Sequence, residues 1–213
     1  MNNNIYTEVT KYYSDKIVTY GDSPRGVDWN GEESQMIRFE QIRRVFLHSN
    51  NISVNDLGCG YGALYEYLGQ YSGADILYTG YDVSKEMIEA ATKHFESHSS
   101  KNLNFVHLKN TEEMKDAHYI VSSGIFNVKL EFDDEQWYDY IVDTINVMYK
   151  KCRYAIAFNC LTSYSDDDKK VDKLFYADPC VMFKYCKENL SKNVTLIHDY
   201  ELYEFTIIVR KNY

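Results

Sequence analysis

The sequence is poor in the features that mark secreted, metal-binding and membrane-spanning proteins. Its five scattered cysteines form no CxxC pair, and its six histidines show no HExxH spacing. Neither a disulfide framework nor a metal site is therefore predicted. No apolar run approaches the roughly 18–20 residues of a membrane span, and the first residues lack the charged and apolar regions of a secretory signal. We expect a cytoplasmic protein with free thiols, no metal and no membrane partner.

Proline and positive charge are scarce as well. The 213 residues include only two prolines, and 32 acidic against 23 basic side chains give a formal net charge of −9. Because nucleic acids bind to basic faces, a nucleic-acid partner is not expected. Hydrophobic residues make up 45% of the chain, enough for the core of a single domain. Tyrosine is abundant, with 21 residues, and it suits a core, an interface or a ligand pocket.

Short apolar strands and helical segments alternate from residue 51 onward. Strands are expected at residues 52–57, 76–81, 103–108, 117–122, 154–158, 193–198 and 204–209. The last two are separated by only five residues, too few for a parallel crossover, so they must run antiparallel. We predict an α/β fold with a doubly wound, Rossmann-like sheet of seven strands, the last one reversed. Residues 1–50 are expected to form an N-terminal helical cap or lid, and residues 51–213 a single globular domain.

A glycine-rich motif, Asp56-Leu-Gly-Cys-Gly-Tyr-Gly62, follows the first strand and opens a helix. Its glycines allow a tight turn and bring bare backbone against a ligand at the helix N-terminus. Asp82 ends the second strand, 24 residues after Gly58, where doubly wound folds bind ribose hydroxyls. We place Asp56 in the loop, where its charge would repel the pyrophosphate of a dinucleotide but attract the ammonium and sulfonium of S-adenosylmethionine (SAM). This favours SAM, with an NAD(P)-binding oxidoreductase as the alternative.

These residues resemble the class I SAM-dependent methyltransferases. The family's first motif is similar to Asp56–Gly62, its second to Gly80-Tyr-Asp-Val-Ser84, and its strand order is 3-2-1-4-5-7-6, over residues 50–210 of this chain. The resemblance implies SAM as cofactor and S-adenosylhomocysteine (SAH) as product. It also implies a cofactor site made of Asp56, Gly58, Cys59, Gly60, Gly62, Asp82, Val83, Asn110, Thr111, Ser122, Ser123 and Gly124.

The resemblance also assigns parts of the cofactor to these residues. The glycines would face the methionine part, Asp82 the ribose diol, and residues 122–124 the reacting methyl group. Val83 and residues 110–111 would lie beside the adenine, although Lys109-Asn110 stands where family members usually carry an acidic residue. The stretch from Gly26 to Phe39, together with the ending from Leu202 to Val209, is similar to small bacterial methyltransferases found with capsule and other surface-polysaccharide genes. That narrower resemblance implies O-methylation of a sugar or phosphoramidate acceptor.

The acceptor is predicted to be a small molecule. Enzymes that methylate amino groups of adenine carry an Asp/Asn-Pro-Pro-aromatic motif after the fourth strand, but this chain has no proline at residues 122–127. The pair Asp178-Pro179 lies after the fifth strand and is interpreted as a turn that opens a helix. An anionic acceptor would require local positive charge. The candidates for a substrate-binding or lid segment are Tyr13, Arg25, Trp29, Gln35 and Arg38, with Tyr12 as a further cover; the arginines could instead pair with Glu32 and Glu33.

An alcohol acceptor would need a base. His198 and Asp199 are the only His-Asp neighbours in the chain, which makes His198 the candidate catalytic base, with a structural histidine as the alternative. Residues 161–192 are expected to form a long loop or lid with a solvated acidic run at 166–168. A non-catalytic SAM-binding module is a further alternative, and both a monomer and a homodimer remain open.

Overall fold

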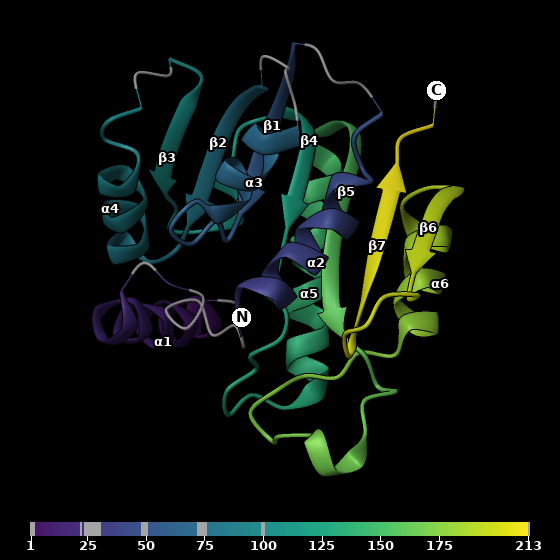
Figure 1. The fold of residues 1–213 in the computed structure, drawn as a ribbon. Coiled ribbons are helices and arrows are strands. Elements are labelled where there is room, and N and C mark those ends of the chain that lie inside the picture. The colour runs from purple at the N-terminus through teal and green to yellow at the C-terminus, as the bar shows by residue number, and fades with distance from the viewer. Residues whose placement is uncertain are drawn as a thin grey trace.

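The fold is a seven-stranded mixed sheet with helices on both faces (Figure 1). The computed structural model describes residues 3–21, 23, 31–47, 51–71, 76–98 and 101–212. The strand order is β3-β2-β1-β4-β5-β7-β6. The strands are β1 (Ile52–Leu57), β2 (Ile76–Asp82), β3 (Leu103–His107), β4 (Ala117–Ser122), β5 (Cys152–Leu161), β6 (Asn193–Ile197) and β7 (Glu204–Arg210). All pairs from β3 to β5 are parallel, and β7 is antiparallel to both neighbours. The predicted order and the reversed last strand are confirmed.

The helices divide between the two faces of the sheet. They are α1 (Asn3–Tyr20), α2 (Glu32–Arg43), α3 (Ala63–Tyr71), α4 (Lys85–His94), α5 (Asp134–Lys151) and α6 (Pro179–Asn189), with short 3-10 helices η2 (Thr111–Glu113) and η3 (Asp167–Lys169). One core cluster joins α2 and α3 to the sheet. A second joins α5 and α6 to the opposite face. Among the described residues, no helix has the length and apolarity needed to cross a membrane.

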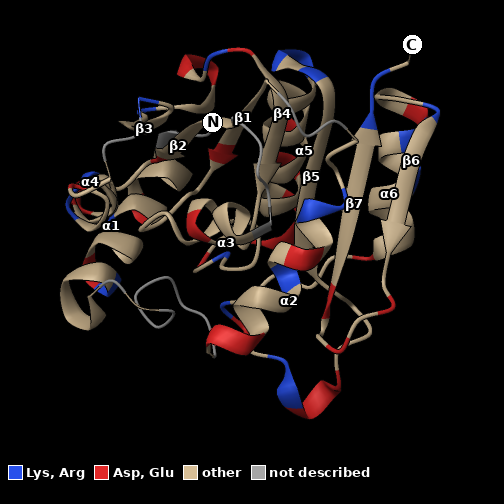
Figure 2. Cartoon of the chain, turned by 45° about the horizontal axis from the view of Figure 1, so that its top comes forward, with Lys and Arg blue, Asp and Glu red and all other residues tan. Residues whose placement is uncertain are grey.

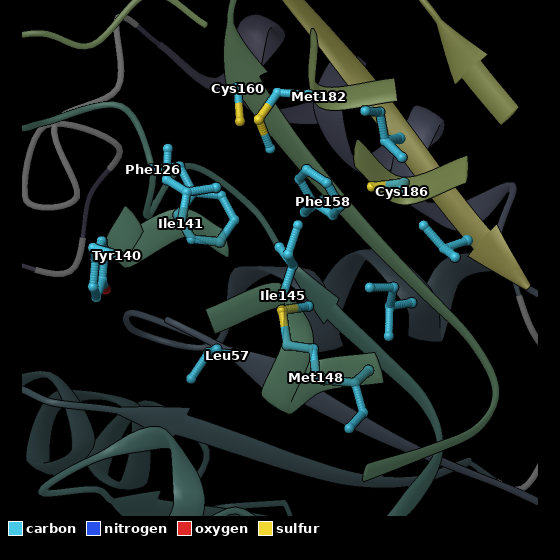
Figure 3. Packing of buried hydrophobic residues seen from close by; sticks show 14 of the residues in the cluster. Leu57, Phe126, Tyr140, Ile141, Ile145, Met148, Phe158, Cys160, Met182 and Cys186 are labelled. Atoms are coloured by element: carbon cyan, nitrogen blue, oxygen red, sulfur yellow. The ribbon is translucent and has the colours of Figure 1, made fainter. Parts of the chain in front are cut away.

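The α5 helix shows why this sequence folds as predicted. Trp137, Ile141, Ile145 and Met148 recur at helical spacing and are fully buried. They pack in one cluster with Phe158 of β5, as Figure 3 shows for Ile141, Ile145 and Met148. Asp133 caps the helix by accepting a hydrogen bond from the Gln136 backbone N–H at 2.8 Å. Periodicity and a cap signal thus agree on this element.

The N-terminal helices pack onto the sheet. Helix α1 lies at the end toward which the parallel strands point (Figure 1) and contacts α4. The Ser14 hydroxyl donates to the Glu86 carboxylate at 2.6 Å, and the Thr10 hydroxyl donates to the Val83 carbonyl at 3.4 Å. Helix α2 ends at Arg43, three residues before Phe46, so Phe46 does not extend the buried face of the helix. Phe46 instead packs edge-on against the Tyr119 ring, with centroids 5.1 Å apart.

The loop after β5 is shorter than predicted, because part of residues 161–192 is helical. Residues 161–192 contain η3 and also α6, so the predicted long loop covers too many residues, although the helix start at Asp178-Pro179 was expected. Asp178 caps α6 by accepting hydrogen bonds from the backbone N–H groups of Cys180 at 2.7 Å and Val181 at 3.2 Å, and Pro179 occupies the first turn. The Asp178-Pro179 pair is therefore the start of a helix, as interpreted from the sequence.

Replacing the cap should weaken α6. We expect Asp178→Ala to lower the free energy of unfolding by about 1 kcal/mol, because two backbone donors lose their acceptor. Urea denaturation measures this. The control is Glu188→Ala, whose exposed carboxylate lies 4.0 Å from Lys184 and should contribute close to nothing. Equal stability of Asp178→Ala and wild type would contradict the capping role.

Candidate functional site

The glycine-rich loop between β1 and α3 forms the centre of the site. The backbone N–H groups of Gly58 and Cys59 both donate to the Tyr81 carbonyl, at 2.7 and 3.0 Å, which holds the loop against the end of β2. Gly58 has a φ of +77°, and a Cβ there would lie 2.0 Å from the Ile125 Cγ2 atom. A side chain is excluded at this position on both counts.

Asp82, the last residue of β2, connects the loop to the following helix. Its side chain accepts hydrogen bonds from the Gly60 N–H at 3.1 Å and the Ser84 N–H at 2.8 Å. The residue is buried. Burial raises the pKa of this carboxyl to about 6, although the backbone N–H donors act in the opposite direction. Asp82 lines a cavity, described below, at the end of a central parallel strand.

Asp56 occupies a different place from the one predicted. It belongs to β1 and is not part of the loop, so the argument that placed its charge in the loop is wrong on that point. Its carboxyl group is buried and accepts a hydrogen bond from the Tyr78 hydroxyl. Burial raises its pKa to about 7, the Tyr78 hydrogen bond opposes the shift, and the charge of Asp82 adds to it.

Two cavities meet at this loop. The first holds about 620 Å³ of empty space and extends under α1. Its lining consists of Tyr6, Val9, Tyr13, Leu57, Gly58, Gly60, Asp82, Val83, Met87, Thr111, Ser123, Gly124, Ile125 and Tyr140. The second, smaller cavity lies beside α2 and includes Gln35, Asp56 and Cys59. Gly58, Gly60 and Ser123 line both. We call the first the cofactor cavity and the second the α2 cavity.

Comparison with known proteins identifies the family. Residues 55–149 match the family model described as "Methyltransferase domain". A protein of Mycobacterium tuberculosis (strain ATCC 25618 / H37Rv) named "Putative methyltransferase Rv1506c" is 48% identical over 168 residues, which cover 79% of this chain and 98% of that protein. This chain belongs to the class I SAM-dependent methyltransferases.

Solved structures with low sequence identity share the fold of this methyltransferase. The magnesium protoporphyrin IX methyltransferase ChlM of Synechocystis PCC 6803, solved with bound SAM, has a TM-score of 0.65 at 12% identity and covers 96% of this chain and 97% of its own. The N-methyltransferase NodS of Bradyrhizobium japonicum WM9, solved with SAH, has a TM-score of 0.64 at 15% identity and covers 95% and 97%.

Three predicted cofactor residues of the methyltransferase line neither cavity. Gly62 has a φ of +91°, and a Cβ there would lie 2.7 Å from the Phe95 ring, so it serves the packing of the loop. Asn110 caps η2 by accepting from the Glu112 N–H at 3.0 Å. Ser122 is buried at the end of β4, and among the described residues its hydroxyl oxygen has no hydrogen-bond partner. The remaining predicted cofactor residues lie on one cavity or both.

Two tyrosines of the cofactor cavity were not predicted. The Tyr6 hydroxyl lies 3.2 Å from the Thr111 hydroxyl, and its ring meets the Tyr140 ring edge-on at 5.7 Å. Tyr6, Val9 and Tyr13 are three and four residues apart, so helical periodicity in α1 could have revealed this face. Tyr140 gives no such signal, because its neighbours in α5 follow an ordinary core pattern.

The predicted substrate-side residues separate in the structure. Tyr13 lines the cofactor cavity, whereas the Tyr12 hydroxyl accepts from the Lys173 ammonium at 3.3 Å and is not part of the lining. The Gln35 side-chain oxygen Oε1 accepts from the Tyr61 hydroxyl at 3.2 Å, and both residues line the α2 cavity. Arg25 and Trp29 lie outside the described residues.

Arg38 is not the surface charge that the sequence suggested. Its Nε donates to one Glu204 oxygen at 2.7 Å and its Nη2 to the other at 2.6 Å, and both residues are buried. Arg38 therefore does not follow the alternative pairing with Glu32 and Glu33, because it forms a bidentate ion pair with Glu204 of β7. Its charge is compensated locally, which weakens the hypothesis that Arg38 binds an anionic acceptor.

The structure gives no support to His198 as the catalytic base. The residue is exposed just after β6 and lines none of the cavities in the described structure. Its ring lies near those of Tyr164 and Phe205, with centroids 5.9 and 6.1 Å away. Asp199 lies 3.9 Å from Arg44. His198 and Asp199 thus contact different residues and do not form the expected His-Asp pair.

The raised pKa values of Asp56 and Asp82 make stability depend on pH. Both folded-state values, about 7 and about 6, exceed the ordinary 3.8, so their contribution is complete below about pH 4 and is lost as pH rises through 6 to 7. We expect the free energy of unfolding of the cofactor-free protein to fall by about 4 kcal/mol between pH 5 and 8. Urea denaturation across this range measures the fall.

Asp56→Asn should flatten that dependence, because an amide does not ionise. Asp116→Asn is the matched control, since Asp116 is exposed and its replacement should leave the slope unchanged. An Asp56→Asn protein with the wild-type slope would contradict the assignment.

Proposed function

We propose that this methyltransferase binds SAM in the cofactor cavity and transfers its methyl group to a small-molecule acceptor, with SAH as the product. The observation that carries the proposal is Asp82, which ends β2, lines the cavity and accepts a hydrogen bond from the glycine loop through its carboxyl group. A carboxylate at this point of a doubly wound sheet accepts hydrogen bonds from the two ribose hydroxyls of a nucleoside. Tyr6, Val83 and Tyr140 supply apolar and aromatic surface for the base.

The charges around the loop fit SAM better than a dinucleotide. Asp56 and Asp82 are both buried on the two cavities that share Gly58 and Gly60. A pyrophosphate in contact with the glycines would bring two further negative charges beside them, whereas the amino-acid end of SAM brings an ammonium. The corrected position of Asp56 in β1 therefore leaves the choice of cofactor unchanged.

When bound, SAM supplies an electrophilic methyl group carried by a sulfonium. The protein contributes position and exclusion of water. The loop after β4 forms one wall of the cavity, and the Gly124 N–H donates to the Asn159 side-chain oxygen at 2.8 Å, which fixes that wall. Tyr6 and Tyr13 of α1 cover the cavity from the other side, which favours a dry site.

We further propose that the acceptor belongs to surface-polysaccharide biosynthesis and is methylated on oxygen. The N-terminal resemblance to methyltransferases of capsule gene clusters supports this setting. The formal net charge of −9 disfavours a nucleic-acid acceptor. Of the two acceptors considered, sugar and phosphoramidate, the compensated charge of Arg38 favours the sugar.

Asp82→Ala tests the cofactor assignment. We expect its affinity for SAH to fall by on the order of 10- to 100-fold, because hydrogen bonds to a charged group contribute roughly 1.5–3 kcal/mol. Isothermal titration calorimetry with SAH measures the change. Glu89→Gln is the control, since Glu89 pairs with Lys85 at 3.1 Å on the exposed side of α4 and should bind SAH like wild type. Wild-type affinity in Asp82→Ala would show that the ribose assignment is wrong.

The rival functions give different results with the wild-type protein. An NAD(P)-dependent oxidoreductase would bind NADH or NADPH and not SAH. A non-catalytic SAM-binding module would bind SAH but release none from SAM across a panel of sugar and nucleotide-sugar acceptors. We expect SAH binding, no NAD(P)H binding, and SAH release that depends on the acceptor.

A further inference from the structure

The loop after β4 forms a wall of the cofactor cavity and is held in place by side-chain hydrogen bonds. Residues 123–125 of this loop line the cavity. The Gly124 N–H donates to the Asn159 side-chain oxygen at 2.8 Å, and the Asn127 side-chain oxygen accepts from the Leu161 N–H at 3.0 Å. Two asparagines, one on β5 and one in the loop itself, therefore fix the position of this wall.

Both asparagines bind the same carboxylate, that of Glu204 at the start of β7. The Asn159 amide nitrogen donates to one oxygen at 3.1 Å, and the Asn127 amide nitrogen donates to the other at 3.2 Å. Arg38 of α2 also donates to each oxygen, at 2.7 Å through Nε and at 2.6 Å through Nη2. A carboxylate accepts about four hydrogen bonds, so these donors fill its capacity. Glu204 and Asn159 are both buried.

The charge of Glu204 determines which way the asparagine amides point. A carboxylate accepts hydrogen bonds and donates none, so it binds the NH2 end of each amide and leaves the oxygen end on the other side. The oxygen of Asn159 then accepts from the Gly124 N–H, and that of Asn127 from the Leu161 N–H. A neutral amide in place of the carboxylate would present an NH2 group to donors that need an acceptor, and at least one of these donors would have to turn.

The same contacts give the Ser123 hydroxyl a direction. The Asn159 NH2 group also donates to the Ser123 hydroxyl oxygen, at 3.3 Å. Because this oxygen accepts from Asn159, its own proton points away from Asn159 and can be donated to another group. Ser123 lines both the cofactor cavity and the α2 cavity. A ligand atom at the junction of the two cavities therefore meets a hydroxyl group that is oriented as a donor.

Arg38 connects helix α2 to this arrangement. Figure 2 shows acidic and basic residues alternating along α2, which contacts β7. Arg38 comes three residues after Gln35, so the two lie on the same side of the helix, and Gln35 lines the α2 cavity together with Ser123. Glu204 therefore holds two walls of the α2 cavity, the loop after β4 through Asn159 and the helix through Arg38.

We propose that Glu204 is a positioning residue of the methyltransferase. Through Asn159 it orients Ser123 and Gly124, so that the Ser123 hydroxyl donates a hydrogen bond to an acceptor atom of SAM or SAH where the two cavities meet. The contact with the cofactor rests on the proposed function, whereas the orientation of Asn159 does not.

The amide signal of Gly124 in NMR spectra reports the orientation of Asn159 without any ligand. Protein labelled with 15N-glycine gives at most ten backbone signals, because the chain has ten glycines. Additional 13C labelling of serine carbonyls selects Gly73 and Gly124, the two glycines that follow a serine. Ser123→Ala removes Gly124 from that selection and so assigns its signal.

Glu204→Gln tests the orientation. We expect this variant to move the Gly124 amide signal and to speed its hydrogen exchange roughly fivefold, because the Asn159 oxygen no longer accepts from it. Glu201→Gln is the control, since Glu201 is exposed and lies three residues earlier, and its Gly124 signal should match wild type. A wild-type Gly124 signal in folded Glu204→Gln would overturn the proposal.

A double variant covers the case in which Glu204→Gln does not fold. Arg38→Met combined with Glu204→Gln removes both charges of the buried pair, a change that proteins often tolerate. This protein also lacks the carboxylate, so we expect the same movement of the Gly124 signal. Circular dichroism shows whether each variant is folded. An unchanged signal in the folded double variant would overturn the proposal as well.

Calorimetry with SAH tests the contact made by Ser123. We expect Ser123→Ala to weaken SAH binding roughly fivefold, which corresponds to the loss of one hydrogen bond. Ser165→Ala is the control, because its buried hydroxyl donates to the Thr162 carbonyl at 2.7 Å and the residue lines neither cavity. The control should bind SAH like wild type. Wild-type affinity in Ser123→Ala would show that the hydroxyl does not contact the cofactor.

A double-mutant cycle distinguishes positioning from a general loosening of the fold. Asn159→Leu has a similar volume but can neither orient Ser123 nor accept from Gly124, and we expect it to weaken SAH binding at least fivefold. Adding Ser123→Ala to Asn159→Leu should weaken binding no further, because the hydroxyl has already lost its orientation. A further fivefold loss in the double variant would mean that Asn159 acts only on stability, and would overturn the proposal.

The same measurements separate this proposal from the proposed function. If Glu204→Gln moves the Gly124 signal but binds SAH with wild-type affinity, the positioning role is wrong and the cofactor site stands. A wild-type protein that does not bind SAH would overturn the proposed function and the Ser123 contact with it. The Gly124 signal would in that case still decide the orientation of Asn159.

Discussion

The site depends on one buried carboxyl group, that of Asp82, and its two backbone donors. The Gly60 N–H fixes the glycine loop against the end of β2, and the Ser84 N–H fixes the start of α4. Ser84 in turn caps α4 by accepting from the Met87 N–H at 3.2 Å, and its hydroxyl lies 3.0 Å from that of Ser14 in α1. The loop, the helix after β2 and the helix that covers the cavity are therefore positioned through one acidic residue.

Glu204 has the corresponding role on the other side of the sheet. It is buried in β7 and receives hydrogen bonds from Arg38 of α2, Asn159 of β5 and Asn127 of the loop after β4. Breaking a buried ion pair by removing one partner typically costs about 3–5 kcal/mol, because the other charge stays buried. The reversed strand thus brings a carboxylate to the ends of the parallel strands, where it joins N-terminal and C-terminal parts of the chain.

Local signals made the sheet, the glycine loop and Asp82 predictable, because each follows from residues close in sequence. The Arg38–Glu204 pair spans 166 positions, and nothing near either residue predicts the other. His198 shows the opposite failure: its neighbour in sequence is Asp199, but the Asp199 carboxylate lies 3.9 Å from Arg44 instead. Tyr140 was missed because a pocket residue in a core helix has the same periodicity as the core.

The two buried carboxylate centres of the chain handle charge differently. Asp56 and Asp82 are buried at a cost that raises their pKa values to about 7 and about 6, and a cationic ligand beside them offsets that cost when it binds. Glu204 is already matched by Arg38 within the protein. The two carboxyl groups beside the glycine loop therefore favour a positively charged ligand, whereas Glu204 has its countercharge within the fold.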